Sequence, residues 1–551
     1  MNKTLLAASL AFAGMLGFAA PAAAAKLVLI NVDPAGQGLN DPTITPAIGG
    51  NPGKSVGEQR RIVYQFAMDM WGATVQSNVD VKIYASFEPL SCNANSGVLG
   101  SAGPNWIDRD FPGAPLKGAW YSSALADSIA GTDLDPDPSD PADIASRFNS
   151  SLGGTNPDNS PCLTGSGWYY GLDGHSPPGT IDFLDVVTHE IGHGLGFLGF
   201  IDVSSGSLAN FDGTPRSDPF THFAYDNVRH LRFDSKLMDN NARLTAITTP
   251  GRTAFSGAHA VSEAAGYLDH RLSFSVTSPS NIAGNYLFGL ASFGPLPTSA
   301  NFSGTLQTAP SNGCAAFTAG LFTGKIALID RGTCAFTVKT KNAQNAGATA
   351  VVIADNAAGS PPPGLGGSDP SITIPAIRVT QADGATFKAN MPVTVTFSQD
   401  PVLLQGADNS GRPLLYTPST LQPGSTYSHY DTSLSPNALM EPNINGDLDA
   451  SHRVDLTRAA YRDMGWQIVP GTAHIRACDT TIPLSLDGGV LPGANVQAAD
   501  DVCVHHVSPA RSSTAYKACM TAFADRLVSD NLITSSQNTA LRNCIAPGSA
   551  P

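Results

Sequence analysis

Residues 182–195 read DFLDVVTHEIGHGL, and this stretch decides the fold because it combines a helical pattern with His and Glu side chains that can bind a metal or transfer protons. Its apolar residues recur at helical spacing, at Phe183, Val186, Val187 and Ile191. Asp182 suits the N-cap of a helix, and Gly194 and Gly196 suit its end. The sequence therefore predicts a capped amphipathic helix over 182–195.

The same helix carries an H-E-x-x-H motif, with His189, Glu190 and His193. Residues four apart lie on one helical face, so both imidazoles can reach a single ion, while Glu190 is displaced toward the water of that ion. A hydrolytic Zn²⁺ takes three protein ligands and keeps a fourth position for water. The motif predicts a catalytic zinc with Glu190 as general base; a structural or accidental match is the alternative.

The third ligand lies elsewhere in the chain. The extended pattern H-E-x-x-H-x-x-G-x-x-H holds through Gly196, but position 199 is Gly instead of His. The sequence better resembles the leishmanolysin-like metzincins, in which an insertion precedes a later His and a Met-turn. The corresponding stretches are Ser-His-Tyr-Asp at 428–431 and Asn-Ala-Leu-Met-Glu-Pro at 437–442. The resemblance implies an α+β zincin fold, His429 as the third ligand and Met440 beneath the metal.

Three alternatives stay open around this site. His429 could be an exposed loop histidine, and a gluzincin arrangement would use Glu263, on the helix-like segment HAVSEAAGYL, as the third ligand. Tyr430 could support the site from outside the ligands, but an aromatic residue there is more often packing.

Residues 324–355 read as a buried strand, a turn, a helix and a second buried strand. Three segments, GKIALIDRGTCAF, KNAQNAGATAVVIADN and ITIPAIRVTQADGATF, follow one another in the order found in the protease-associated (PA) domain, a small α/β module. The resemblance covers 276–401. It implies a discontinuous catalytic domain, formed by 26–275 and 402–470, with the PA domain between the second and third metal ligands.

The ends of the chain have different character. Lys3, an interrupted apolar stretch from Leu5 to Phe18 and small residues at 22–25 indicate a signal peptide over 1–25. Strand, helix and strand are expected at 26–32, 55–71 and 79–87, followed by a Gly- and Pro-rich loop region over 90–176. A helix capped by Asp455 is expected at 455–465, and residues 471–551 are expected to form a small disulfide-stapled segment with helices at 514–528 and 535–544.

An exported chain can oxidise its cysteines, and all eight lie beyond the expected signal. Pairing by proximity predicts the bonds 92–162, 314–334, 478–503 and 519–544. Cys92 could instead cap a metal in a latent form, but a bridge to Cys162 is favoured. His505 and His506 are interpreted as surface residues beside a disulfide.

Composition excludes several classes of protein. Lys and Arg number 31 against 45 Asp and Glu, a net charge of −14, so the basic surface of a nucleic-acid binder is missing. No later stretch approaches the roughly 18 uncharged apolar residues that span a bilayer. We expect a secreted or periplasmic protein; a bound Ca²⁺ is conceivable but unsupported by the sequence, and the oligomeric state stays open.

Together these features predict a secreted zinc endopeptidase acting on proteins or peptides. The alternative is an inactive zincin-like binding or adhesion protein that uses the PA domain as its contact surface. A zinc aminopeptidase is a third possibility, because PA domains also occur in that class, but no constellation of carboxylate-bridged metals is visible in the sequence.

Overall fold

The computed structural model describes residues 24–135, 137–359, 362–367, 369–445 and 448–546. The chain divides into two compact units, Met1–Tyr267 with Arg412–Pro551 and Leu268–Gly411. The second unit extends beyond the range 276–401 at both ends. The expected signal segment 1–25 lies outside the described residues, apart from positions 24 and 25.

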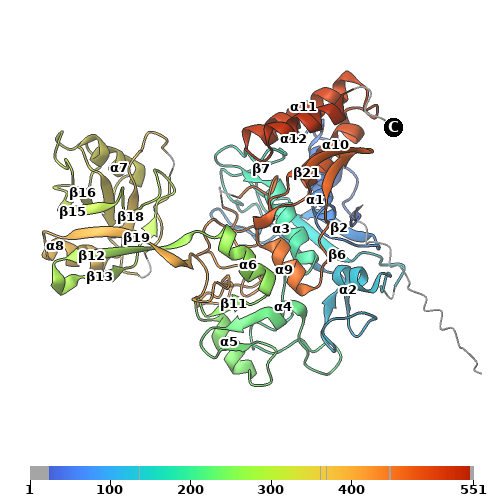
Figure 1. The fold of residues 1–551 in the computed structure, drawn as a ribbon, viewed down its shortest axis with the longest axis horizontal. Helices are drawn as coiled ribbons and strands as arrows, with labels where there is room; N and C mark the ends of the chain where they lie inside the picture. The colour runs from blue at the N-terminus through green and yellow to red at the C-terminus, as the bar shows by residue number, and fades with distance from the viewer. Residues whose placement is uncertain (1–23, 136, 360–361, 368, 446–447, 547–551) are drawn as a thin grey trace, which may run out of the picture. The chain divides into compact units, whose positions relative to one another are not determined.

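A mixed four-stranded sheet forms the centre of the first unit (Figure 1). Its strands, in spatial order, are β1 (Leu27–Asn31), β2 (Val81–Glu88), β6 (Ile144–Asn149) and β3 (Gly100–Pro104). The first three run parallel, and β3 runs antiparallel at the edge. β1 and β2, with α1 (Val56–Gly72) between them, confirm the expected strand, helix and strand.

Two helices cover one face of this sheet. The inward residues of β6 are Ile144, Ser146 and Phe148, and the residues between them are exposed. Tyr64 of α1 shares a 2.7 Å hydrogen bond with Ser146, and Phe183 of α3 (Phe183–Gly194) packs edge-on against Phe148. The period of two along β6 thus places α1 and α3 on the same face.

Most of the remaining elements of the first unit are short. Before the insertion they are η1 (Gly38–Asn40), β4 (Ile107–Asp108), β5 (Tyr121–Ser122), α2 (Ser123–Ala130), β7 (Trp168–Tyr169), β8 (Ile181–Asp182), α4 (Pro219–Phe223), β9 (Ala224–Asp226), β10 (Leu231–Arg232), α5 (Asn240–Ile247), β11 (Thr253–Phe255) and α6 (Ala258–Tyr267). After it come α9 (Thr457–Met464), β20 (Thr472–Ile475), β21 (Cys478–Pro483), η3 (Asp487–Gly489), α10 (Pro492–Val502), the π-turn η4 (Cys503–Val507), α11 (Thr514–Ser529) and α12 (Ser535–Ile545).

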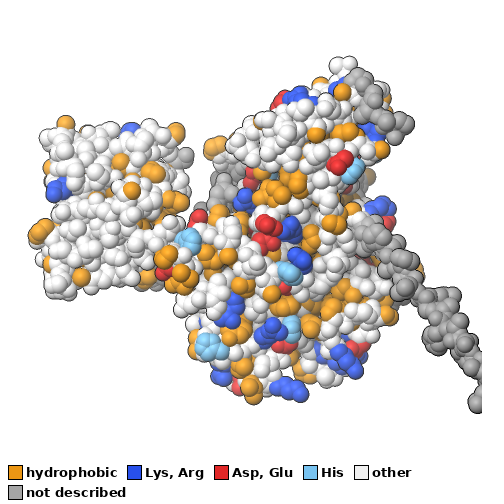
Figure 2. Space-filling view, viewed as in Figure 1, with side chains coloured by type: hydrophobic (Ala, Val, Ile, Leu, Met, Phe, Trp, Pro, Cys, Tyr) orange, Lys and Arg blue, Asp and Glu red, His pale blue; other side chains and the backbone are white. Residues whose placement is uncertain are grey.

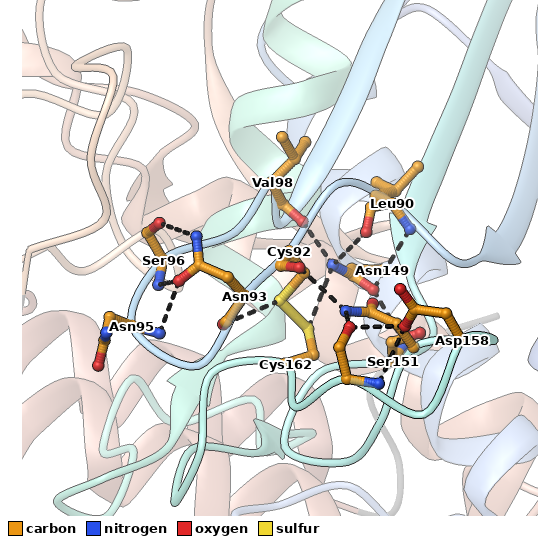
Figure 3. Close-up of a disulfide and its surroundings, with 12 residues drawn as sticks. Leu90, Cys92, Asn93, Asn95, Ser96, Val98, Asn149, Ser151, Asp158 and Cys162 are labelled. Carbon is orange, nitrogen blue, oxygen red and sulfur yellow. Dashed lines mark hydrogen bonds between the residues drawn. A yellow bond between two sulfur atoms is a disulfide. The ribbon is translucent and has the colours of Figure 1, made fainter.

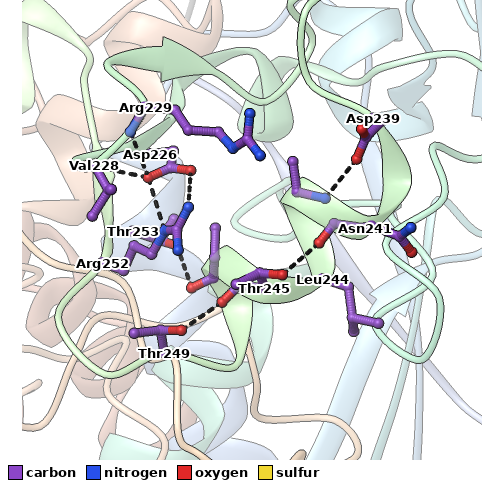
Figure 4. Close-up of polar contacts among 12 residues, drawn as sticks. Asp226, Val228, Arg229, Asp239, Asn241, Leu244, Thr245, Thr249, Arg252 and Thr253 are labelled. Carbon is purple, nitrogen blue, oxygen red and sulfur yellow. Dashed lines mark hydrogen bonds and ion pairs between the residues drawn. The ribbon is translucent and has the colours of Figure 1, made fainter.

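A buried ion pair braces the three-stranded sheet β10-β9-β11 (Figure 4). Arg252 donates to both carboxylate oxygens of Asp226, Nε at 3.0 Å and Nη2 at 2.8 Å. The backbone N–H groups of Val228 and Arg229 bind the same carboxylate. Although burial opposes it, these contacts hold the pKa of Asp226 below its usual range. The carboxylate therefore fixes the turn between β9 and β10 and joins it to β11.

The C-terminal segment packs on the rest of the first unit, partly through α1. Figure 1 shows α10, α11 and α12 gathered in one group, in red. The rings of Phe66 on α1 and Phe523 on α11 stack with centroids 6.2 Å apart, and His452 Nε2 lies 2.9 Å from a carboxylate oxygen of Asp530. The expected helices at the end of the chain are confirmed as α11 and α12.

The disulfides confirm half of the predicted pairing. Cys92–Cys162 and Cys314–Cys334 form as predicted, but the predicted bonds 478–503 and 519–544 are wrong. The bonds are Cys478–Cys544 and Cys503–Cys519. β21 packs against α12, which brings Cys478 to Cys544, while α10 carries Cys503 away from β21 to α11. Sequence proximity could not reveal this helix packing.

The second unit contains one eight-stranded sheet, in the order β13-β12-β19-β15-β16-β17-β18-β14. Its elements are β12 (His270–Ser278), η2 (Ser280–Ile282), β13 (Gly284–Tyr286), β14 (Gly289–Leu290), β15 (Ser303–Thr308), β16 (Ile326–Asp330), α7 (Phe336–Asn345), β17 (Ala350–Ala354), β18 (Ala376–Val379), α8 (Gln381–Ala389) and β19 (Thr394–Leu404). The four strands β15 to β18 are parallel. β16, α7 and β17 confirm the expected strand, helix and strand.

The continuous apolar runs of this unit are buried on both sides of its sheet. Ile326 and Leu328 belong to one hydrophobic cluster, and their neighbours Ala327 and Ile329 belong to another. β17 divides its residues between the same two clusters. Burial on both faces explains why these strands show no alternation in the sequence.

No helix among the described residues is long and apolar enough to cross a membrane. On the face drawn in Figure 2, basic side chains lie singly among acidic ones on the first unit.

We expect peptide mapping without reduction to recover peptides that link Cys478 to Cys544 and Cys503 to Cys519. Removing the first bond, which spans 66 residues, should cost more stability than removing the second, which spans 16. Loop-closure entropy predicts about 4 against about 3 kcal/mol for the paired Cys→Ser variants. Recovery of a peptide linking Cys478 to Cys503 would contradict the packing described above.

A second prediction concerns Asp355 in the second unit, which binds Arg331 at 3.0 Å and also Arg378. Although burial opposes it, these ion pairs lower the pKa of Asp355 to about 2. Because an unfolded Asp has a pKa of about 3.9, these contacts contribute about 2–3 kcal/mol that is fully present above about pH 5 and is lost progressively as the pH falls toward about 1. Asp355→Asn should remove this acid-labile stability, measured by unfolding at several pH values. Asp369→Asn, on an exposed carboxylate of the same unit whose pKa is lowered by hydrogen bonds from Ser371, should change the pH dependence much less.

Candidate metal centre

Three imidazoles converge in the first unit. His189 and His193 lie one turn apart on α3, and His429 comes from the loop after the insertion. Their Nε2 atoms are close, with His193 3.0 Å from His189 and 3.1 Å from His429. All three side chains are buried. The three histidines expected as ligands are therefore brought together.

The opposite nitrogen of each ring faces a backbone carbonyl. The Nδ1 atoms of His189, His193 and His429 lie 2.6, 2.8 and 2.8 Å from the carbonyl oxygens of Leu439, Phe197 and Ser425. A carbonyl only accepts hydrogen bonds, so each Nδ1 carries the proton. Each neutral ring thus directs an Nε2 lone pair at the same point.

Burial keeps the rings neutral. It lowers the pKa of His189 to about 4 and that of His193 to about 3, and it holds the pKa of His429 well below its usual value. Three lone pairs at this separation repel one another and cannot form hydrogen bonds among themselves. A cation removes the conflict, and tetrahedral Zn²⁺ with Zn–N distances of about 2.0–2.1 Å needs Nε2 atoms roughly 3.3 Å apart. The donor set fits a zinc ion.

Glu190 lies beside the histidines, as the motif predicts. Its carboxylate is buried and binds the backbone of Ala102 on β3, and burial raises its pKa to about 8. A Cβ at Gly100 would lie only 2.8 Å from Oε1 of Glu190. The glycine therefore lets the edge strand approach the carboxylate, and the GSAGP segment that forms this strand gave no strand signal in the sequence.

Aromatic side chains anchor α3 through its carbonyl groups. Trp71 donates to the carbonyl of Thr188 at 3.0 Å, Tyr461 to that of Gly192 at 2.5 Å and Trp466 to that of Leu195 at 2.9 Å. The predicted cap is confirmed, because Asp182 accepts a 2.9 Å hydrogen bond from the N–H of Leu184. The three aromatic donors fix the position of α3 along its axis and its rotation about that axis. The H-E-x-x-H motif gave no signal for them.

Met440 lies beneath the helix. A Cβ at Gly192 would come within 2.8 Å of the Met440 sulfur, so the close approach requires glycine between the two histidines. Leu439, the preceding residue, accepts from His189. The N–H of Leu439 donates in turn to Asp455 at 2.5 Å.

Asp455 lies one residue before the N-cap of α9, which is Leu456 and not Asp455 as predicted. Its Oδ2 accepts from the N–H of Leu439, and its Oδ1 accepts a 3.4 Å hydrogen bond from the N–H of Thr457, so the carboxylate joins the segment below the histidines to the start of α9. Packing also explains why position 199 is Gly and not the His of the extended motif. A Cβ at Gly199 would lie 2.2 Å from the Tyr427 ring, and the N–H of Gly199 donates to the Ser428 hydroxyl at 3.2 Å. The absence of the usual third His thus leaves room for the segment that carries His429.

Other candidates have structural roles. Glu263 lies 3.3 Å from Arg458 and accepts from the N–H of Gly489, so it does not join the histidines. Tyr430 packs on Phe197 with ring centroids 4.9 Å apart, which agrees with the packing interpretation.

The histidines and Glu190 line a cleft of about 1200 Å³. Residues 100–102 of β3 form part of its wall, and Ser91 and residues 95–98 form part of its rim. The bond Cys92–Cys162 braces this rim (Figure 3), so Cys92 is not a free thiol that could cap the metal. Asn149 Nδ2 adds a 2.8 Å hydrogen bond to the carbonyl of Val98. The rim is thus held covalently and by side-chain amides.

One known domain family matches part of the second unit. Residues 302–387 match the model of the PA domain. Three known proteins share partial similarity: a receptor homology region, transmembrane domain- and RING domain-containing protein 1 from Oryza sativa subsp. japonica (36% identity), a C5a peptidase from Streptococcus pyogenes (39%) and vacuolar-sorting receptor 2 from Arabidopsis thaliana (34%). The matches cover 18%, 16% and 20% of this chain and 19%, 7% and 21% of those proteins.

Solved structures are similar over about a quarter of this chain. A zinc aminopeptidase from Bacillus subtilis aligns with 25% identity and a TM-score of 0.19, over 26% of this chain and 36% of its own. An aminopeptidase from Aneurinibacillus sp. strain AM-1 aligns with the same identity and TM-score over 24% and 31%. Scores this low establish no common fold for the whole chain. The comparisons identify residues 302–387 as a PA domain, a module found in receptors and peptidases alike.

Proposed function

We propose that this chain is an exported zinc-dependent endopeptidase of the leishmanolysin-like metzincin type. The observation that supports the proposal is the convergence of three Nε2 lone pairs beside the buried carboxylate of Glu190, in a cleft bordered by an edge strand. Four disulfides among the described residues suit an oxidising compartment.

The chemistry follows from the residues around this point. A zinc ion bound by His189, His193 and His429 would supply an activated water near neutral pH and polarise the carbonyl of the scissile peptide. Glu190 would accept the proton of that water and deliver it to the departing amine. Burial raises the pKa of Glu190 toward the value of about 7 of a zinc-bound water, which suits proton transfer between the two groups.

The edge strand gives a reason to expect cleavage within chains. Among the strands of the described residues, β3 pairs with β6 alone, and residues 100–102 line the cleft. Unpaired backbone groups along such an edge can bind an extended peptide as an added strand. This mode of binding requires no free terminus, so it favours an endopeptidase over an aminopeptidase.

The potential metal-binding groups also favour an endopeptidase with one zinc ion over an aminopeptidase with a carboxylate-bridged metal pair. Among the described residues, two groups of side chains could hold a cation: the three histidines, and Asp127 with Asp133 and Asp135. Of these, the histidines line the cleft. A metal pair bridged by carboxylates therefore lacks support here.

We expect Glu190→Gln to lower kcat for an unfolded protein substrate by about 10²–10⁴-fold while one zinc per chain is retained. The control is Glu88→Gln, which makes the same change on an exposed carboxylate of the cleft. Undiminished cleavage by the Glu190 variant would refute the proposal. A zinc-loaded wild type that cleaves neither proteins nor peptides would favour a binding or adhesion protein instead.

We expect His429→Ala to weaken zinc binding by more than about 100-fold, because loss of an outer-shell partner alone costs 10–100-fold. Zinc content after dialysis against a graded chelator series measures the effect. His505→Ala, at an exposed histidine, is the matched control. Equal zinc retention by the two variants would show that His429 is not a ligand.

A further inference from the structure

A second cluster of titratable side chains lies outside the histidine centre. It contains five aspartates, brought together from β4, α2, the loop after α2 and the residue before β6: Asp108, Asp127, Asp133, Asp135 and Asp143. One carboxylate oxygen from each of Asp127, Asp133 and Asp135 lies within 4.8 Å of the others. Three acidic groups therefore face one small volume.

Several of these oxygens are buried and have no hydrogen-bond partner among the described residues. Asp127 is 2% exposed; its Oδ1 accepts from the N–H of Leu134 at 2.9 Å, and its Oδ2 has no partner in the described part of the chain. Both carboxylate oxygens of Asp135 and Oδ2 of Asp108 are likewise buried, and no described residue binds them. Buried polar atoms are almost always paired, so these oxygens call for a ligand.

The charge of the cluster is poorly balanced. Lys82 lies 3.0 Å from Asp133 and, among the described residues, is the cation that acts on Asp133, Asp135 and Asp143. Burial, together with the neighbouring carboxylates, raises the pKa of Asp127 to about 8 and that of Asp135 to about 7. Either protons or a bound cation must neutralise such a group.

We propose that Asp127, Asp133 and Asp135 bind a calcium ion, with Asp108 and Asp143 adding negative charge beside it. The potential donors are all carboxylate oxygens, which suit a hard cation and not a thiol- or imidazole-preferring metal. Ca²⁺ accepts six to eight oxygens in flexible geometry, whereas Mg²⁺ usually takes one or two carboxylates and keeps its waters. The crowding of carboxylates therefore favours Ca²⁺.

The ion would brace the wall of the cleft. The N–H of Asp143 donates to the carbonyl of Lys82 on β2, and the carboxylate of Asp143 accepts from the N–H of Lys82 at 2.7 Å. The carbonyl of Asp143 accepts from the N–H of Asn105 at 2.7 Å, just after β3. β3 carries the residues that line the cleft and contact Glu190. Calcium would thus tie α2 and residues 131–135 to the end of the edge strand.

The test uses the full-length, zinc-loaded protein and calcium as the added ligand. We expect calorimetric titration to give about one Ca²⁺ per chain, and Tm to rise by at least about 3 °C at a 100-fold excess over Kd. Asp127→Asn with Asp135→Asn should abolish both effects. Asp137→Asn, on an exposed carboxylate of the same loop that binds Ser139, should behave as the wild type.

A terbium experiment places the ion without depending on the folding of the double variant. Trp106 donates to the carbonyl of Asp140 at 3.0 Å and lies two residues before Asp108. We expect Tb³⁺ bound to the wild type to be sensitised by tryptophan excitation, displaced by Ca²⁺ and markedly dimmer in Trp106→Phe.

Two results would overturn the proposal. The first is a wild type whose Tm does not respond to Ca²⁺ and is higher at pH 5 than at pH 8, which would mean that protons neutralise the carboxylates. The second is Ca²⁺ binding that persists in a folded double variant, which would place the ion elsewhere.

Discussion

The hydrogen bond from Nδ1 of His189 to the carbonyl of Leu439 is the contact on which the centre depends. It is 2.6 Å long and joins residues 250 positions apart. By fixing the ring tautomer, it directs Nε2 toward His193 and His429. The carbonyl is itself held in place, since the N–H of Leu439 binds Asp455. A chain that failed to bring these distant segments together would leave two histidines on a helix and no centre.

The insertion of a whole unit between the second and third histidines is compatible with this requirement because its two ends meet. His270, at the start of β12, pairs with Leu404, at the end of β19, and the N–H of Gln405 binds the carbonyl of Asp269 at 2.7 Å. The strands that enter and leave the unit are therefore neighbours in one antiparallel ladder. For the first unit, the insertion is equivalent to a short loop, so the segment with His429 can still return to α3.

Support for the site comes from residues with no motif of their own. Trp71, Tyr461 and Trp466 hold α3 from positions far apart in the sequence, and Gly192 and Gly199 matter because nothing larger fits against Met440 and Tyr427. The same holds for β3, whose glycines and alanine lack strand propensity and form a strand only because β6 offers a partner. Such features depend on packing, which a local pattern does not encode.

The sequence by itself determined the elements whose signals are local: the capped helix at 182–195, the H-E-x-x-H spacing, the apolar runs of β16 and β17 and the PA segments. A period of 3.6 or an unbroken apolar run reports on the nearest residues alone. Only the tertiary structure decided which distant groups meet. It placed His429 beside His193, joined Asp455 to the N–H of Leu439, and paired Cys478 with Cys544. These contacts are set by how helices and strands pack, and packing depends on the whole chain at once.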